Sequence, residues 1–497
     1  MKKSSIFSKL CASKISTCLL MISLISCVDH KLEVPDESGY PEEVGAIITG
    51  KCATPGCHND ISYSNAGGID LSSWDALFRG GRNGSSVIPY STAYSFLLYF
   101  VNTDTTLGQV LLPTMPLNAP ALSRSEYQTL YDWILQGAPD KNGRINYADD
   151  PARKKLYVCM QGCDQVAVLD GTSQNIMRYI SVGTDPTLIE APHMVRVSPD
   201  GQFWYVVFYS GNIVQKFRTS DDSLVGTLTI GAADWNTIMI TPDGSKGFVN
   251  GTNAGTTVVI DLNSMTEITR FSIDYPHGGF ITADGRWLYL TSQLGNFINK
   301  IDLMDPFYSY DAIILQPGEV KTTASRYDPH EMILSGDGSK YYVSCQTSNQ
   351  VRIFQSSNDS LLATLTIGTK PQEFAASSDH PYVYITCTED VQDVSRKGSV
   401  YVINTDNNTI VTSLYTGYQP HGIAVDDDKE LVFVANLNLD TNGPAPHHVS
   451  DCGGRNGYIT CIDERTLQLY YKSLPNGDRF QYNQEVLRAP YFVSYRK

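Results

Sequence analysis

The sequence is short of basic residues: 37 Lys and Arg stand against 52 Asp and Glu, so the formal net charge of the 497-residue chain is −15. An acidic surface repels phosphate backbones, which argues against a nucleic-acid partner. After residue 25 no stretch is long and apolar enough to be a transmembrane helix. No P-loop, dinucleotide fingerprint, Ser-His-Asp set or pair of catalytic carboxylates stands out, so the enzyme classes that use these motifs gain no support.

The first 26 residues are expected to be a signal peptide. Residues 1–14 carry four lysines and no acid, and the apolar run from Ile15 to Ile25 is too short to span a bilayer as a mature helix. The run ends in Leu24-Ile25-Ser26-Cys27, which resembles the lipobox of bacterial lipoproteins. This resemblance implies that Cys27 is lipidated and becomes the first mature residue. The alternative is an ordinary signal peptide with an incidental cysteine.

A lipid anchor would tether the protein to a membrane without a spanning segment, in the periplasm or at the cell surface. Removing residues 1–26 takes away four lysines and no acid, so the mature net charge becomes −19. Residues 27–41 are predicted to be a polar tether between the lipid and the folded chain.

The stretch Cys52-Ala53-Thr54-Pro55-Gly56-Cys57-His58 places two thiols and an imidazole within seven residues. A His directly after the second Cys is the arrangement that attaches a c-type haem, because the sulfurs bond the porphyrin vinyl groups and the imidazole reaches the iron. Four residues separate the cysteines, where the usual spacing has two. The sequence predicts one covalent haem; the alternative is a disulfide between Cys52 and Cys57 beside a bystander His58.

The residues after this motif repeat the order found in a large family of extracytoplasmic proteins. A glycine-rich middle is followed by the loop Leu112–Leu117 and by a helix that ends in Trp133-Ile134-Leu135-Gln136-Gly137-Ala138. Ser123 and Glu126 have the spacing of a capping box at the start of that helix. This order resembles bacterial cytochrome c domains. The resemblance implies a small all-α cytochrome c-like domain at residues 42–148.

The same resemblance implies the axial ligands of the haem iron. His58 would be the proximal ligand and Met115, in the Met-Pro loop, the opposite one. Thioether ligation favours reduced iron and raises its potential. The alternative for Met115 is a methionine of the core.

Residues 150–497 carry an internal repeat. Asp-Gly turns are each followed by an aromatic β-run and then by a second strand, and the period matches a four-stranded propeller blade. The repeat resembles the YVTN family of seven-bladed β-propellers through Leu156-Tyr157-Val158 and Val432–Asn436. Seven blades require that both chain ends close the ring. Because Arg488–Val493 aligns with Glu190–Val195, the C-terminal strand is predicted to complete the first blade.

Seven polar residues are predicted to begin the innermost strands and to line one mouth of the central channel. They are His193, Asn236, His277, His330, Gln372, His421 and Tyr491. The favoured interpretation is structural, with each His bonded to the backbone of a neighbouring blade. A substrate or ligand funnel and a second metal or tetrapyrrole are the alternatives. The long insertion 436–456 contains His447 and His448, and is predicted to contact a ligand or partner.

Three functions follow from these patterns. A haem with His and Met ligands has no open coordination site, so the first is an electron-transfer protein whose propeller docks a redox partner protein or a small-molecule substrate. The second is a propeller-based redox enzyme with its site at the channel mouth. The third is a non-catalytic surface binding protein. The sequence indicates no disulfide pairing for the six remaining cysteines, Cys159, Cys163, Cys345, Cys387, Cys452 and Cys461.

Overall fold

The computed structural model of the chain describes residues 37–390, 397–439, 443 and 452–496. The predicted signal peptide 1–26, the lipidation site Cys27 and the pair His447 and His448 lie outside the described residues. Within the described part, no helix has both the length and the apolar character needed to cross a membrane.

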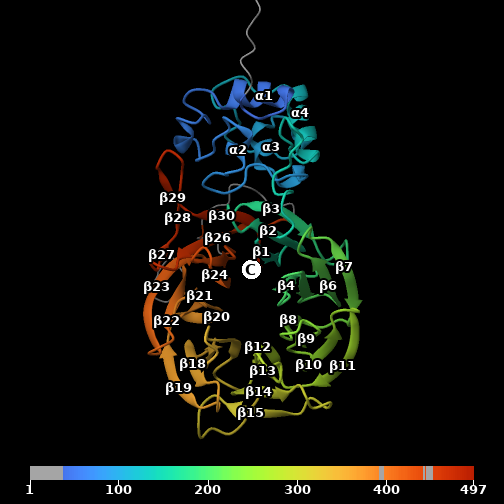
Figure 1. Cartoon of the computed structure of the whole chain (residues 1–497), viewed down its shortest axis with the longest axis vertical. Coiled ribbons are helices and arrows are strands. Elements are labelled where there is room, and N and C mark those ends of the chain that lie inside the picture. The colour runs from blue at the N-terminus through green and yellow to red at the C-terminus, as the bar shows by residue number, and fades with distance from the viewer. Residues whose placement is uncertain (1–36, 391–396, 440–442, 444–451, 497) are drawn as a thin grey trace, which may run out of the picture. The chain divides into compact units, whose positions relative to one another are not determined.

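Seven antiparallel sheets are arranged around a common axis as the blades of a β-propeller (Figure 1). Each innermost strand contacts the innermost strands of the two neighbouring blades, which closes the ring. The innermost strands are β31 (Pro490–Arg496), β4 (Pro192–Val197), β8 (Trp235–Ile240), β12 (Pro276–Ile281), β16 (Pro329–Leu334), β20 (Thr369–Ala376) and β24 (Pro420–Asp426). The second strands, in the same blade order, are β1 (Lys155–Met160), β5 (Phe203–Phe208), β9 (Lys246–Gly251), β13 (Trp287–Ser292), β17 (Lys340–Cys345), β21 (Tyr382–Glu389) and β25 (Leu431–Asn436).

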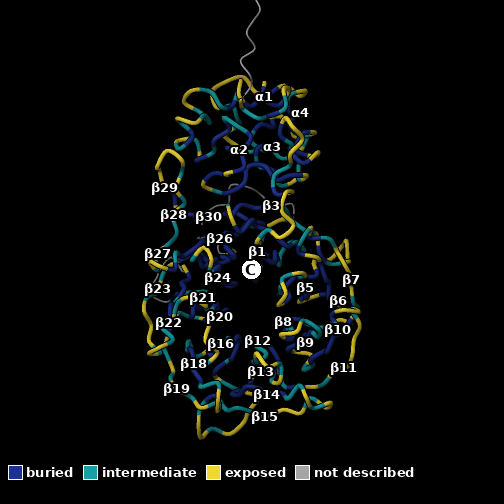
Figure 2. Tube along the Cα trace, viewed as in Figure 1, coloured by how far each residue is buried: buried dark blue, intermediate teal, exposed yellow. Residues whose placement is uncertain are grey.

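The third and fourth strands of the blades lie progressively further from the axis. The third strands are β2 (Gln165–Asp170), β6 (Ile213–Arg218), β10 (Thr256–Asp261), β14 (Phe297–Asp302), β18 (Gln350–Gln355), β22 (Gly398–Asn404) and β26 (Asn456–Asp463). The outer strands are β3 (Ile176–Ser181), β7 (Leu224–Thr229), β11 (Thr266–Ser272), β15 (Tyr310–Ile314), β19 (Leu361–Thr366), β23 (Thr409–Gly417) and β27 (Gln468–Leu469). Figure 2 shows the second strands buried, whereas the outer strands other than β3 are at least partly exposed, as expected when sheets pack face to face around a ring.

Asp-Gly turns set the register of the blades. In the third blade Asp243 accepts hydrogen bonds from the Thr241 hydroxyl (2.6 Å) and from the backbone N–H of Ser245 (3.0 Å). Gly244 follows with a φ of +72°, a conformation that glycine adopts without steric cost. The turn joins β8 to β9 and positions the aromatic and β-branched residues of β9 inside the blade interface.

The C-terminal strand closes the ring as predicted. β31 pairs antiparallel with β1, with Lys155 opposite Arg496 and Val158 opposite Val493. The first blade therefore takes its innermost strand from the end of the chain and its other three strands from residues 155–181. This exchange leaves β1 with a partner on both sides, so no inner sheet edge is exposed.

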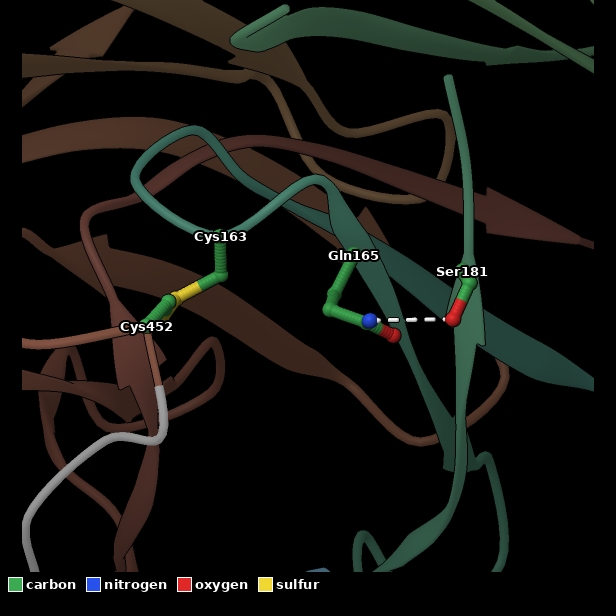
Figure 3. The surroundings of a disulfide bond; sticks show 4 residues. All are labelled: Cys163, Gln165, Ser181 and Cys452. Atoms are coloured by element: carbon green, nitrogen blue, oxygen red, sulfur yellow. Dashed lines mark hydrogen bonds between the residues drawn. A yellow bond between two sulfur atoms is a disulfide. The ribbon is translucent and has the colours of Figure 1, made fainter. Parts of the chain in front are cut away.

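A disulfide bond links the first blade to the last blade, where the ring closes. Cys163, in the turn between β1 and β2, is bonded to Cys452, which precedes β26 of the last blade (Figure 3). The two Cα atoms are 5.3 Å apart, and 289 positions separate the cysteines in sequence. A covalent link over so long a loop removes much chain entropy from the unfolded state. The other candidate cysteines, Cys159, Cys345, Cys387 and Cys461, are buried free thiols.

The prediction of a separate, small all-α cytochrome c-like domain is wrong. Among the described residues the fold is nearly all β, and the α-helices are four and short: α1 (Glu42–Ile47), α2 (Trp74–Leu77), α3 (Phe96–Val101) and α4 (Arg124–Leu135). Residues 38–497 form one compact unit. Residues 38–148, called here the N-terminal segment, are mostly loops and single helical turns, because frequent Gly, Pro and Ser residues interrupt helical periodicity.

Hydrogen bonds and a shared core explain why this segment is not separate. Asn175, before β3, donates to the carbonyls of Phe78 and Arg79 (both 3.0 Å). The hairpin of β28 (Tyr471–Ser473) and β29 (Arg479–Gln481) follows β27, and the strand β30 (Asn483–Arg488) then returns to pair with β26 in the sheet of the last blade. From β28 Lys472 donates to the Arg79 carbonyl (3.1 Å), and from β30 Gln484 donates to the Asn83 carbonyl (3.1 Å). The apolar cluster of the N-terminal segment also continues into the first blades.

Candidate functional site

A cavity of about 460 Å³ lies in the N-terminal segment, and four of the predicted site residues line it: Cys52, Cys57, His58 and Met115. Pockets that hold cofactors usually measure about 300–1,000 Å³ and are mostly apolar. Apolar side chains form much of the remaining wall: Ile69, Leu71, Phe96, Leu97, Phe100 and Val101. The motif and the Met-Pro loop, which are almost sixty residues apart in sequence, thus meet around one space of cofactor size.

The imidazole of His58 is held in a defined orientation. Its Nδ1 lies 3.0 Å from the carbonyl oxygen of Ile69. An Nδ1–H that donates to a carbonyl leaves the lone pair on Nε2, which is the state that ligates a metal. Burial lowers the pKa of His58, so the ring is neutral at physiological pH.

Neither cysteine of the motif is in a disulfide. Cys52 ends the single π-helical turn η1 (Ile48–Cys52) and is buried, whereas Cys57 is half-buried. Burial, with a smaller contribution from the Cys57 thiol, raises the pKa of Cys52 to about 11. The structure therefore brings two free thiols to the cavity in place of the alternative disulfide.

Met115 belongs to the loop between α3 and α4. Its backbone N–H donates to the carbonyl of Phe100 at 2.7 Å, which ties the loop to the end of α3. The side chain is half-buried, packs against the apolar core and also lines the cavity. Its assignment as an iron ligand stays a prediction.

The helix after the Met-Pro loop starts as predicted. The Ser123 hydroxyl accepts from the backbone N–H of Glu126, and the Glu126 carboxylate accepts from the backbone N–H of Ser123 (2.8 Å), which is a complete capping box. Lys51, next to the first motif cysteine, also pairs with Glu126 at 2.6 Å. The hydrogen bond from Lys51 lowers the pKa of Glu126. One carboxylate thus caps α4 and connects the helix to the cysteine motif.

The propeller brings the predicted channel residues together. Five of them form a closed cycle of ring contacts, called here the channel ring: His193, His277, His330, His421 and Tyr491. Centroid separations range from 3.7 Å for His421 and Tyr491 to 6.3 Å for His193 and His277. Asn236 and Gln372 bond to polar side chains of their surroundings, at Thr252 and Gln346. A register shift interrupts the pairing of every innermost strand at this position, and such bulges re-aim side chains.

Two of the histidines bond to neighbouring backbone, as the structural interpretation expects. Nδ1 of His277 lies 3.0 Å from the carbonyl oxygen of His330, and Nδ1 of His421 lies 3.2 Å from that of Tyr491. Burial lowers the pKa of His277 to about 4 and that of His421 to about 3. The imidazoles are therefore neutral, and each keeps the lone pair on Nε2.

A carboxyl pair and an arginine, which the sequence patterns did not single out, lie beside the ring. Glu331 and Glu373 are buried, and Arg196 acts electrostatically on both. Burial raises the pKa of each carboxyl group. Oε1 of Glu331 accepts from the backbone N–H of Met332 at 2.9 Å, whereas its Oε2 has no hydrogen-bond partner among the described residues. All three residues line a second cavity of about 260 Å³ inside the propeller. Each Glu directly follows one of the seven predicted channel positions in sequence, Glu331 after His330 and Glu373 after Gln372, and that was the available signal.

The fold defines the chain as a seven-bladed β-propeller protein. No protein-family model matches it. Over 187 residues it is 23% identical to antigen Lp49 of Leptospira interrogans, a match that covers 36% of this chain and 40% of that protein. The chain therefore spans less than half the length of this relative.

Solved propeller structures are similar in fold. A protein of Bacteroides uniformis, provisionally assigned as a 6-phosphogluconolactonase, superimposes with a TM-score of 0.53 at 15% identity over 69% of this chain and 99% of that one. A protein of unknown function from Desulfotomaculum acetoxidans gives a TM-score of 0.50 at 14% identity over 69% of this chain and 98% of that one. At such identities the likeness extends to the fold alone.

Proposed function

We propose that the chain is a lipid-anchored, extracytoplasmic electron-transfer protein that carries one covalent c-type haem. One observation carries the proposal: Cys52, Cys57, His58 and Met115 line a single, largely apolar cavity of about 460 Å³. Haem bound there would supply one-electron exchange between two iron oxidation states. A surface of the propeller would then dock a redox partner protein or bind a small-molecule substrate.

The residues present fit such a group. The free thiols of Cys52 and Cys57 are available for thioether bonds, and His58 presents Nε2 because Ile69 holds Nδ1. The apolar wall would keep water from a haem bound there, and this would favour the less charged, reduced iron. Met115 would complete the coordination with a thioether sulfur.

The disulfide between Cys163 and Cys452 supports an extracytoplasmic location, because structural disulfides persist in oxidising compartments. Cys27 would carry the lipid that anchors the mature chain to a membrane. These two features agree with the site of c-type haem attachment outside the cytoplasm.

Expression of the mature chain together with haem-maturation machinery tests the proposal. The purified protein is expected to show a Soret band, one haem per chain by the pyridine haemochrome method, and a haem-stained band that survives denaturing electrophoresis. The double variant C52A/C57A should lose the covalent band completely, because no thioether bond can form.

The matched control is C345A, which removes a buried free thiol of β17 outside the cavity and should keep a full haem content. A wild-type chain that folds but binds no haem would refute the proposal. The same holds if C52A/C57A carries as much covalent haem as C345A does.

The role of Met115 predicts a change in redox potential. Replacing it by His exchanges a thioether for an imidazole, which binds oxidised iron better, so M115H is expected to lower the potential by on the order of 100 mV. Spectroelectrochemical titration measures the shift. M160L, in the core of β1, should leave the potential unchanged. Equal potentials for M115H and the wild type would assign Met115 to the core.

The channel ring favours a second function, a redox enzyme with its site inside the propeller. Four neutral histidines and two buried carboxyl groups converge there, close to a cavity of about 260 Å³. A haem potential that shifts on addition of a small-molecule substrate would support this enzyme over a simple carrier.

A further inference from the structure

Three ligand-type side chains meet inside the propeller, on the innermost strands of three different blades. His330 comes from β16, Glu373 from β20 and His421 from β24. One ligand atom from each lies within 4.8 Å of the other two, and all three residues are buried. Imidazole nitrogens and a carboxylate oxygen this close need only small adjustments to surround one ion.

The hydrogen bonds of the two histidines leave nitrogen atoms free to ligate. His421 donates Nδ1–H to the Tyr491 carbonyl at 3.2 Å, so its Nε2 carries the lone pair. Nε2 of His330 has no hydrogen-bond partner although the residue is only 5% exposed. A buried polar atom without a partner is costly, and a bound ion would satisfy it. Nδ1 of the same ring lies 3.4 Å from the Gln293 side-chain amide, and Nε2 carries the lone pair when that amide presents its oxygen and accepts from Nδ1–H.

The charges around the cluster also favour a cation. Glu331 and Glu373 place two carboxyl groups in a buried site, where Arg196 is the cation acting on both. Gly278 gives this pair its space, because a Cβ there would collide with the Glu331 carboxylate and backbone. A divalent ion would place a positive charge beside these two buried carboxyl groups.

We propose that His330, His421 and Glu373 bind a divalent first-row transition ion in the propeller channel. Two imidazoles favour ions such as Zn²⁺ over Ca²⁺ and Mg²⁺, which prefer oxygen ligands. Two histidines and one carboxylate are a donor set that leaves a coordination position for water or a small ligand. The site is independent of the haem proposal, because it shares no residue with the cavity of the N-terminal segment.

Zn²⁺ binding to the full, tag-free chain after chelator treatment tests the proposal. Competition with a chromophoric chelator should give one saturable Zn²⁺ site per chain, and elemental analysis for zinc keeps haem iron out of the count. Co²⁺ added instead should produce visible d–d absorption typical of nitrogen and oxygen ligands. These probes report on the metal alone and need no assumed activity.

Single variants of the three ligands should each weaken Zn²⁺ binding by more than about 100-fold, since loss of even an outer-sphere partner costs about 10–100-fold. E373Q is the main variant, because it keeps the shape of the side chain while removing its charge. H330A and H421A follow, with thermal unfolding of each metal-free protein recorded to establish that it folds.

Two controls locate the site. H193A removes a channel-ring histidine that is not one of the three ligands. It should therefore bind Zn²⁺ within about threefold of the wild type. H447A/H448A removes the histidine pair of the last insertion and should bind equally well. The proposal is overturned if the wild type shows no saturable Zn²⁺ site at micromolar concentration, if E373Q binds like H193A, or if H447A/H448A abolishes binding.

Discussion

Truncating the chain after Leu487 is expected to abolish the cooperative unfolding transition of the propeller. The deletion removes the whole of β31, and with it the innermost strand of the first blade. Phe492 and Val493 are buried, and burying a side chain of this kind stabilises a fold by about 1.5–3 kcal/mol. Arg496 also donates to the carbonyls of Pro151 and Arg153, so the start of the ring loses its contacts with the end.

Differential scanning calorimetry of the truncated and full chains measures the effect. The truncated chain should expose the inner edge of β1 and aggregate, because an unpaired edge recruits other strands. A synthetic peptide of residues 488–497 added in trans should restore part of the transition by strand addition. A truncated chain that melts like the full one would show that β31 is not needed for closure.

Replacing Asp222 by Ala is expected to destabilise the propeller by about 3–5 kcal/mol, since it leaves a buried cation without its partner. Asp222 accepts from Nζ of Lys155 and from the Tyr157 hydroxyl, both at 2.9 Å. The side chains of Lys155 and Asp222 are 1% and 0% exposed. Burial already lowers the pKa of Lys155 against the opposing effect of Asp222, so the lysine depends on this carboxylate to stay charged.

Denaturant unfolding of a short variant series measures this loss. D221A changes the neighbouring, exposed aspartate and should stay within about 0.5 kcal/mol of the wild type. K155M/D222A replaces both partners and should be more stable than D222A alone, because no unpaired charge stays buried. If the double variant is as unstable as the single one, the buried charge is not the source of the loss.

Repetition made the propeller predictable. Asp-Gly turns such as Asp243-Gly244 have a local physical cause, so the sequence marks each turn without knowledge of the neighbouring blade. The same regularity placed β31, because Pro490 and Tyr491 follow the pattern of Pro192 and His193. Seven-position spacing from the turns also located the channel ring before its ring contacts were visible.

The N-terminal segment was less predictable because its stability comes from distant residues. Its motif, its Met-Pro loop and the cap at Ser123 are local and were recognised. Its attachment to the propeller depends on Asn175, Lys472 and Gln484, whose partners are backbone carbonyls that leave no trace in composition or spacing. The resemblance to an independent all-α domain therefore led to the wrong fold class.

Only part of the metal-ligand cluster in the channel could be predicted from the sequence. His330 and His421 occupy a position of the repeat that is His in four blades. Glu373 occupies the next position, where the residue type differs from blade to blade. Only the closed ring brings β16, β20 and β24 together around one point. The partner of Cys163 could not be predicted from the sequence either, because its pairing with Cys452 depends on the contact between the first and last blades.

The hydrogen bond between Gln484 and Asn83 joins residues 401 positions apart, and this sets an order of events during synthesis. The segment with Cys52 and Cys57 leaves the ribosome first, but its supports in β28 and β30 leave among the last. At about 5–20 residues per second the interval is on the order of tens of seconds. Throughout it the wall at Asn83 and Gly84 lacks the Gln484 side chain that packs on it, so the N-terminal segment can reach its final packing only after the end of the chain has been made.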